Sequence, residues 1–502
     1  MPIPVVDIFA GPGGLGEGFS SLQRRDKTGG AQYRIVVSAE MEKNAAATLR
    51  LRSFFRMFPK GKAPSSYYDY LAGRRDEPYS ARTASEWSAA GREALQLKLG
   101  DSHDDAVLDA RLESELTRDE PWVLIGGPPC QAYSLAGRSR NAGVKGYQAS
   151  EDERHYLYRH YLRLIARYRP AVFIMENVTG LLSSKVDGVR MFPKILDDLR
   201  SAAGPNSYRL VPLVASASLT GLEPEAKDFI VRAEDFGAPQ ARHRVILMGV
   251  SQELPLRALR PLVPSNCPAT VRDVIGGLPK LRSGLTDFEI SSWRDAARAV
   301  YEKAAAAAET VDEEVASYLA RLGQSVPKKD PGSGGRWIEG RDKEKELPRG
   351  LAQWILDGKV RGYANHEVRP HMSADLERYA YAAVFAELHG RSPRGRQEFP
   401  KPLHPKHKSW KADKFVDRFK VQLWDAPSST LLSHLSKDGH YFIHPDPTQL
   451  RSISVREAAR LQTFPDNYFF EGARGAQFRQ VGNAVPPFLA SQIAAVVQSI
   501  LD

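Results

Sequence analysis

Cysteine is nearly absent from this chain of 502 residues, which contains only Cys130 and Cys267. Two thiols cannot build a four-cysteine zinc site, and they argue against a disulfide framework. Free thiols are typical of a reducing, intracellular compartment. The sequence therefore predicts a cytoplasmic protein without a structural metal.

Long apolar runs are also missing. No stretch approaches 18 uninterrupted apolar residues, so we expect no membrane span. The N-terminal residues MPIPVVDIFAGPGG lack the basic and apolar regions of a signal peptide. The formal net charge of +10 favours a polyanionic partner, nucleic acid first, although a basic surface that serves only solubility explains it equally well.

Short runs rich in Val and Ile recur along the chain. They are Ile3–Phe9, Tyr33–Ala39, Trp122–Ile125, Ala171–Met175 and Val245–Val250. Such runs are typical of strands buried on both faces of a mainly parallel sheet, and several precede a polar turn and an amphipathic stretch. The pattern predicts a doubly wound α/β fold that binds ligands at the carboxyl ends of its strands.

The middle of the chain has a different texture. Residues 296–322 predict one long helix by propensity, and the polar, Gly-rich residues 328–342 predict a turn-rich loop. Residues 391–420 carry ten Lys or Arg against three acidic residues. Phe399, Trp410 and Phe415 lie within that run and either anchor it to its domain or pack against DNA. A charge run is more often a solvated face than a binding surface.

The first chemical motif is VVDIFAGPGGLGEGF, Val5–Phe19, in which a strand leads through a Gly-rich turn into a helix. Glycine lets the backbone approach a ligand closely. The motif satisfies G-x-G-x-x-G, and Glu40 closes the next predicted strand as a ribose-binding acid would. Taken alone, the motif fits an NAD-binding dehydrogenase equally well, and a tight turn without a ligand is the simplest alternative.

The second motif, WVLIGGPPCQAYSLAGRSR, places Cys130 directly after two prolines at the end of a buried strand. The residues that follow, up to Ala149, contain three Gly and three Lys or Arg, which suits a loop that closes over a substrate. A small buried cysteine without a chemical role is the alternative.

Three further motifs end on polar residues. AVFIMENVTGLL puts Glu176 and Asn177 just past a hydrophobic strand, where a carboxylate must be solvated, paired or functional. DFGAPQARHRVILMG alternates Arg242 and Arg244 along a strand start, which predicts that both lie on one face. Charges at a strand end are the alternative for each. QVGNAVPPFLA places Asn483 in a turn before an apolar C-terminal helix.

In this order, the five motifs resemble those of the bacterial DNA (cytosine-5) methyltransferase family. Order and spacing agree over roughly residues 3–52, 120–280 and 420–500. The resemblance implies a Rossmann-like fold of S-adenosylmethionine-dependent methyltransferases with a smaller inserted target-recognition domain. It implies a catalytic and cofactor-binding domain at residues 1–279, completed by 450–502, and a recognition domain at residues 280–449.

The resemblance also implies roles for single residues. Cys130 matches the nucleophile, Glu176 the carboxylate that meets the cytosine ring, Arg244 the arginine that reaches the base and Arg242 the arginine that supports it. The implied contacts with S-adenosyl-L-methionine are Phe9, Ala10, Gly11, Gly13, Gly14, Leu15, Glu40, Met41, Asp101, Pro128, Asn483 and Ala484. The expected DNA contacts are Gln131, Ser134, Arg138, Arg394, Arg396, Lys406, Lys408 and Lys411.

The implied chemistry needs these residue types. A thiolate added to carbon 6 of cytosine turns carbon 5 into an enamine carbon that accepts a methyl group. A carboxylic group at ring nitrogen 3 stabilises the charge that develops, and a base in stacked duplex must be rotated out first. The sequence thus predicts a monomer that acts on double-stranded DNA, with a cognate restriction endonuclease or defence proteins as candidate partners.

Two alternatives share these motifs. The first is a tRNA cytosine-5 methyltransferase, against which the long middle domain argues. The second is a non-catalytic DNA-binding relative, against which the complete set of Cys130, Glu176 and Arg244 argues.

Overall fold

The computed structural model describes residues 1–24, 30–117, 119–129, 157–186, 188–214, 224–256, 258–286, 292–340, 347–406, 410 and 417–502. These residues form two compact units. Unit 1 comprises Met1–Pro64, Tyr79–Pro268 and Asn483–Asp502, and unit 2 comprises Ser65–Pro78 and Ala269–Gly482. Residues 269–279 and 450–482, which the sequence analysis grouped with the catalytic domain, lie in unit 2 by this division.

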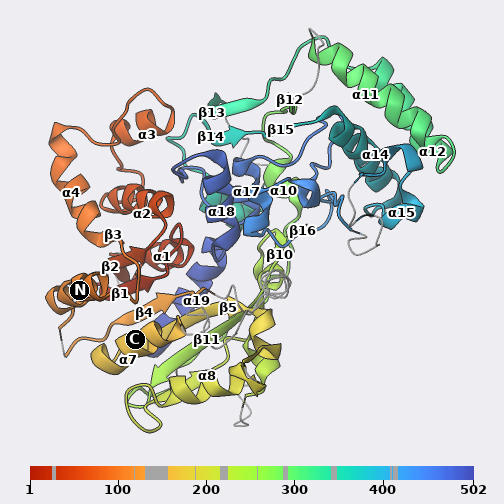
Figure 1. The fold of residues 1–502 in the computed structure, drawn as a ribbon. Helices are drawn as coiled ribbons and strands as arrows, with labels where there is room; N and C mark the ends of the chain where they lie inside the picture. Colours follow the sequence, from red (N-terminus) through yellow and green to blue (C-terminus); the bar gives the residue numbers. More distant parts are fainter. Residues whose placement is uncertain are drawn as a thin grey trace. The chain divides into compact units, whose positions relative to one another are not determined.

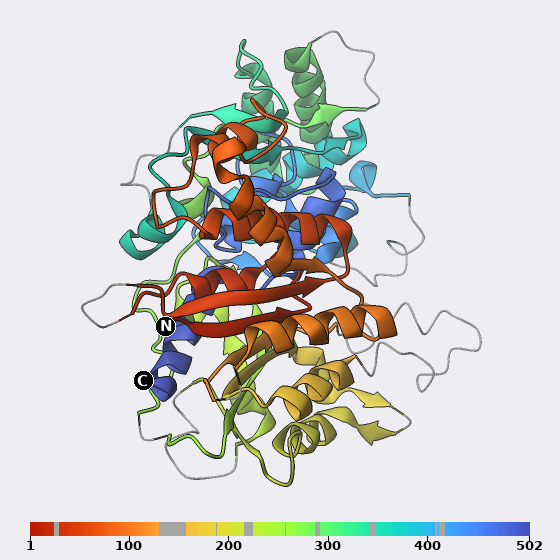
Figure 2. The same cartoon turned by 90° about the vertical axis from the view of Figure 1, so that its left-hand side faces the viewer.

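Unit 1 contains a sheet of eight described strands in the order β3-β2-β1-β4-β5-β11-β8, with β9 beside β11 (Figure 1). The bounds are β1 Ile3–Ile8, β2 Tyr33–Glu40, β3 Ala94–Gln96, β4 Val123–Gly126, β5 Val172–Val178, β8 Tyr208–Val211, β9 Ile230–Arg232 and β11 His243–Ser251. The strands from β3 to β5 are parallel, and β1 and β2 are visible as the two red arrows in Figure 2. β11 is antiparallel to its neighbours.

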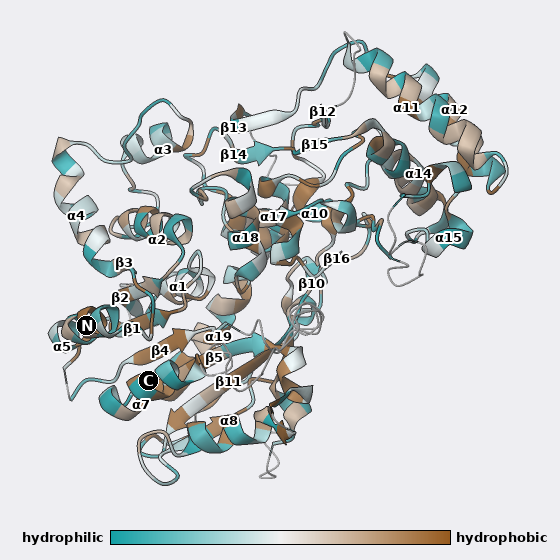
Figure 3. Ribbon diagram, in the orientation of Figure 1, coloured by the Kyte–Doolittle hydropathy of each residue, from teal (hydrophilic) through white to brown (hydrophobic). Residues whose placement is uncertain are grey.

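Helices cover both faces of this sheet. One face packs against α5 (Ser102–Glu115), α7 (Tyr158–Tyr168) and α8 (Met191–Arg200), and the other against α1 (Gly14–Ser20) and α19 (Pro487–Leu501). Alternate residues enter opposite cores, so that Val5 faces one layer and Val6 the other. This double burial explains why the strands are brown along most of their length in Figure 3, and it confirms the predicted α/β fold.

Two more helices, α2 (Lys43–Arg56) and α4 (Ala84–Glu93), follow β2 and precede β3 in the chain. At the C-terminus, the helical stretch Arg474–Leu501 is long and apolar enough by composition to cross a membrane. Because 72% of its most apolar window is buried within the protein, and a core helix passes the same test, it is weak evidence for a span.

Unit 2 contains a helical core and an antiparallel pair of strands, β13 and β14. The main elements are α3 Ser65–Leu71, α10 Val271–Ile275, α11 Trp293–Ala308, α12 Glu313–Gln324, β13 Gly334–Glu339, α13 Arg349–Ile355, β14 Gly362–Glu367, α14 Ser373–His389, α17 Val455–Leu461 and α18 Arg474–Asn483. The prediction of a single helix over 296–322 is wrong, because α11 ends at Ala308 and a second helix, α12, begins at Glu313. The Asp312 side chain caps α12 by accepting a hydrogen bond from the Val315 N–H. The loop predicted over 328–342 contains β13, which pairs with the distant strand β14.

The segment that contains α17 holds a cluster of buried charged side chains. The Arg451 guanidinium donates to both carboxylate oxygens of Glu457 at 2.7 Å, and the two side chains are at most 1% exposed. His366 lies within this cluster: its Nδ1 is 2.7 Å from Ser454 Oγ, and its Nε2 is 3.1 Å from the Pro279 carbonyl oxygen. Burial lowers the pKa of His366 to about 4, so this imidazole is neutral in the folded protein.

We therefore expect the protein to lose stability as the pH falls from about 6.5 to about 4. The unfolded imidazole binds a proton near its ordinary pKa, whereas folded His366 does so only near pH 4, so acid favours unfolding across that window. Urea unfolding followed by tryptophan fluorescence at several pH values measures the effect. His366→Gln should flatten the dependence in part, and an equally steep loss in that variant would contradict the assignment.

Candidate active site

The order of the strands changes direction beside β1. β2 and β3 lie on one side of it, and β4 and β5 lie on the other. In open α/β sheets, such a reversal leaves a crevice at the carboxyl ends of the adjacent strands. Glu40 is the last residue of β2, the turn at 9–14 follows β1, and Gly127 follows β4. Glu176, expected just past its strand, lies inside β5, two residues before the end. The structure thus brings four of the sequence motifs to one edge of the sheet.

The Gly-rich turn after β1 has an unusual backbone. Phe9, Gly11 and Gly13 have φ values of 52°, 56° and 91°, in the left-handed region that disfavours most side chains. A Cβ atom on Gly14 would lie 2.2 Å from the carbonyl oxygen of Val485, so the turn packs directly on the residue after Ala484 in the QVGNAVPP motif. A Cβ on Gly11 would meet nothing within 4 Å, which leaves open space at that side of the turn.

Glu40 fastens this turn to the end of β2. One carboxylate oxygen accepts a hydrogen bond from the Gly11 N–H at 2.9 Å, and the other accepts from the Glu42 N–H at 2.8 Å. Burial raises the pKa of Glu40, while these two hydrogen bonds oppose the shift. The next side chain, Met41, is 61% exposed, which is uncommon for a large apolar residue.

The sequence analysis missed Asp7, which lies within the apolar run of β1. Its carboxyl group is 1% exposed, and neither oxygen has a well-formed hydrogen bond among the described residues. A Cβ on Gly16 would lie 2.9 Å from Asp7 Oδ2, so the carboxyl lies directly below the start of α1. Burial raises the pKa of Asp7 to about 8, although Arg56 and the Gly16 N–H act in the opposite direction. The sequence does contain a signal for this residue, because an acidic side chain stands inside the otherwise apolar run VVDIF.

Glu176 forms an ion pair with Arg244 across β5 and β11. Arg244 Nε lies 2.8 Å from Glu176 Oε1, and the side chains are 11% and 13% exposed. Arg244 also donates from Nη1 to the His243 carbonyl oxygen at 2.8 Å. On the other side, a Cβ on Gly127 would lie 2.9 Å from Glu176 Oε2. Glycine at the end of β4 therefore lets the carboxylate come close to the segment that leads to Cys130.

Asn177 links the ends of β4 and β5. Its Nδ2 donates to the Pro128 carbonyl oxygen at 3.4 Å, and its Oδ1 accepts from the Val178 N–H at 2.9 Å. Arg242 differs from Arg244, because it is 2% exposed and precedes β11, which begins at His243. The strand alternation that predicted a shared face for the two arginines therefore does not extend to Arg242.

Other predicted residues have separate settings. The Asp101 side chain is exposed and caps α5 by accepting from the His103 and Asp104 N–H groups, a structural role that needs no ligand. Leu15 is buried in the core of unit 1, and Asn483 is exposed. Cys130, Gln131, Ser134, Arg138, Lys408 and Lys411 lie outside the described residues. No group of three or more described His, Cys, Asp or Glu residues could hold a metal ion.

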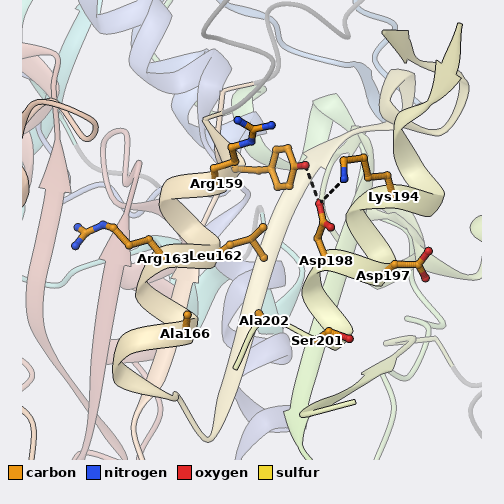
Figure 4. Close-up of a pocket in the computed structure, with 10 residues that line it drawn as sticks. Arg159, Leu162, Arg163, Ala166, Lys194, Asp197, Asp198, Ser201 and Ala202 are labelled. Carbon is orange, nitrogen blue, oxygen red and sulfur yellow. Dashed lines mark hydrogen bonds and ion pairs between the residues drawn. The ribbon is translucent and has the colours of Figure 1, made fainter. Parts of the chain in front are cut away.

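A separate pocket of about 550 Å³ lies between α7 and α8 and contains none of the predicted site residues (Figure 4). Several of its polar side chains contact one another. Asp198 accepts from the Tyr158 hydroxyl at 2.9 Å and lies 3.6 Å from Lys194 Nζ. The Tyr158–Asp198 hydrogen bond joins the two helices.

The sheet topology and the edge that carries these motifs define the class of protein first, the Rossmann-like fold of S-adenosylmethionine-dependent methyltransferases. A prophage-encoded E. coli protein, described as a candidate DNA modification methyltransferase, shares this fold, with a TM-score of 0.52 and 19% identity over 99% of both chains.

The sequence comparisons define the family. The family model for C-5 cytosine-specific DNA methylase matches residues 80–499. The chain is 32% identical to a type II methyltransferase of Bacillus paralicheniformis over 99% of both proteins. It is also 26% identical to a DNA (cytosine-5-)-methyltransferase of Aeropyrum pernix, over 99% of this chain and 98% of that protein. The chain belongs to the C-5 cytosine-specific DNA methylase family, which confirms the predicted enzyme class.

The buried Asp7 carboxyl leads to a prediction about pH. Because its folded pKa is raised to about 8, the stability that its neutral form contributes is full below about pH 4 and is lost as the pH rises towards 8. The slope of this loss is at most about 1.4 kcal/mol per pH unit. Asp7→Asn should remove it, so the free energies of unfolding of variant and wild type should diverge between pH 5 and 8. Asp197→Asn, on an exposed carboxylate, is the control; parallel curves for Asp7→Asn would contradict the prediction.

Proposed function

We propose that this enzyme transfers a methyl group from S-adenosyl-L-methionine to carbon 5 of cytosine in a specific duplex DNA sequence, with Cys130 as covalent nucleophile. The observation that carries this proposal is the Glu176–Arg244 pair, held beside Gly127 at the end of β4. The chain continues from that glycine through two prolines to Cys130. The carboxylate and the guanidinium lie beside the segment that leads to Cys130, and together with that thiol they are the groups that the reaction needs.

The residues at the ends of β1 and β2 fit the cofactor. The Glu40 carboxylate offers acceptor oxygens for ribose hydroxyls, the space beside Gly11 leaves room for a ligand, and exposed Met41 offers an apolar surface for adenine. We assign Phe9, Ala10, Gly13, Gly14, Ala484 and Asn483 to the same pocket. S-adenosylmethionine supplies the electrophilic methyl group when it is bound.

Each catalytic residue then has a distinct task. The Cys130 thiolate adds to carbon 6 of the flipped cytosine, which makes carbon 5 nucleophilic. Glu176 stabilises the charge that builds on the ring at nitrogen 3. Arg244 holds Oε1 of that carboxylate, and Oε2 lies on the side of β4, where the base would enter. Loss of the carbon-5 proton and expulsion of the thiolate complete the cycle.

The basic segment, residues 391–420, supports a role in DNA binding. Phe399 and Trp410 are 2% and 5% exposed in the helical core, so these aromatic residues anchor the segment. Arg394, Arg396 and Lys406 are exposed. Anchored aromatics with outward cations suit contacts with the phosphate backbone, which orient DNA without conveying sequence. The relatives named type II methyltransferases favour a restriction–modification role in the cytoplasm.

The first functional test concerns the two cysteines. Cys130→Ala should abolish transfer of labelled methyl groups to duplex DNA, because no other residue can form the adduct. Cys267→Ala is the matched control and should keep wild-type activity. Bisulfite sequencing identifies the modified cytosines. Methyl transfer by Cys130→Ala would refute the covalent mechanism, and modification of tRNA instead of duplex DNA would favour the RNA-directed alternative.

The second functional test concerns Glu40. S-adenosylhomocysteine should raise the melting temperature by mass action, and Glu40→Ala should reduce that shift markedly. Glu42→Ala, which removes the cap of α2 but not the proposed ribose ligand, is the control for local destabilisation. Stabilisation by NADH without any effect of S-adenosylhomocysteine would identify the turn as a dinucleotide site.

A further inference from the structure

A small hairpin follows the strand that carries Glu176. Its strands, β6 (Lys185–Val186) and β7 (Val189–Arg190), are antiparallel, with Lys185 opposite Arg190 and Val186 opposite Val189. Residues that oppose each other directly project on the same face of a hairpin. Val186 is buried in the core of unit 1, and Lys185 and Arg190 are exposed. Val186 thus anchors the hairpin in the core, although Val189 opposite it is 58% exposed, and the two cations are accessible to solvent.

The two cations are unpaired within the described residues. In the part of the chain that the structure describes, neither Lys185 nor Arg190 has an ion pair, whereas Lys194 and Arg200 on the following helix pair with Asp198 and Asp197. The first turn of α8, which begins after Arg190, has no acidic side chain. Asp187, which follows Val186 in the sequence, lies outside the described residues. Like charges directly opposite each other destabilise a hairpin, and an anionic partner would relieve this repulsion.

The position of the hairpin indicates which anion its two cations would bind. β5 ends at Val178, and a short 3-10 helix, η4 (Thr179–Ser183), leads from it to β6. η4 contacts β11, the strand of Arg244, and buried Leu181 holds it in the core. The cations therefore project from a rigid extension of the carboxyl edge of the sheet, on which the proposed substrate must lie. A duplex presents one phosphate charge about every 1.7 Å along its axis at that edge.

We propose that the hairpin Lys185–Arg190 binds the phosphate backbone of the duplex next to the target cytosine. This proposal rests on the proposed function, because it takes duplex DNA as the substrate. Contacts of this kind position DNA and do not select its sequence.

The test is the salt dependence of DNA binding by the full-length protein. A 30-base-pair duplex that contains a methylated site of the enzyme is titrated between 50 and 200 mM salt. Lys185→Ala/Arg190→Ala removes two phosphate contacts, so the slope of log K against log salt should fall by about 1.8. The affinity ratio of wild type to variant should then shrink about twelvefold over that range. The methylated cytosines should remain the same.

Two variants control for charge and folding. Arg34→Ala/Arg111→Ala removes the same net charge from unit 1, but these arginines pair with Glu115 and Arg34 lies near the start of β2, at the opposite edge of the sheet. It should keep the wild-type slope. Lys185→Arg/Arg190→Lys keeps both cations and should also keep it, and melting temperatures verify folding.

The possible failures are distinguishable. If the wild type does not bind duplex DNA, both the proposed function and this inference are overturned. If the wild type binds and methylates DNA but the hairpin variant keeps its slope, only the hairpin assignment is wrong. A slope change with tRNA and none with duplex DNA would assign the hairpin to an RNA substrate, and a changed set of methylated cytosines would mean that it contacts bases.

Discussion

Burial of both faces of the central sheet is the constraint on which the rest of unit 1 depends. Helices α1 and α19 cover one face and α5, α7 and α8 cover the other, so the strands can carry few polar side chains along their length. Chemistry is thereby confined to the strand ends, where Glu40 and Glu176 can be partly solvated. The reversal of strand order beside β1 then decides which ends are neighbours, and it groups residues that are distant in the chain.

Much of this arrangement could be predicted because local signals agree with the global fold. Each Val- and Ile-rich run forms a strand within three residues of its expected bounds, and the Gly-rich turn follows β1 as its composition requires. The pairing of Glu176 with Arg244 could not be predicted. It depends on the antiparallel register of β5 with β11, which places Arg244 opposite Val178, and register between strands so distant in sequence has no local signature.

The wrong predictions likewise concern features that local sequence patterns do not determine. The helical propensity of residues 296–322 is real, but Asp312 supplies a cap that divides the stretch into two helices, which pack against each other in the core of unit 2. The polar composition of residues 328–342 concealed β13, which depends on its partner β14. Asp7 was overlooked because a single acid does not change the prediction of a strand. In the structure its carboxyl is buried below the turn, and burial of such a group is costly.

Charge shows most clearly why composition and structure must be combined. The net charge of +10 favoured a nucleic-acid partner, yet Arg451, Arg456 and Arg460 are at most 1% exposed and bind carboxylates and carbonyl oxygens within unit 2. These guanidiniums stabilise the fold and contribute little to the surface potential, because their charge is compensated where it is buried. Only cations that are exposed and locally uncompensated can attract DNA from solution. Lys185 and Arg190 are exposed and have no ion pair among the described residues, so the location of these charges, more than the total charge, supports their proposed role in DNA binding.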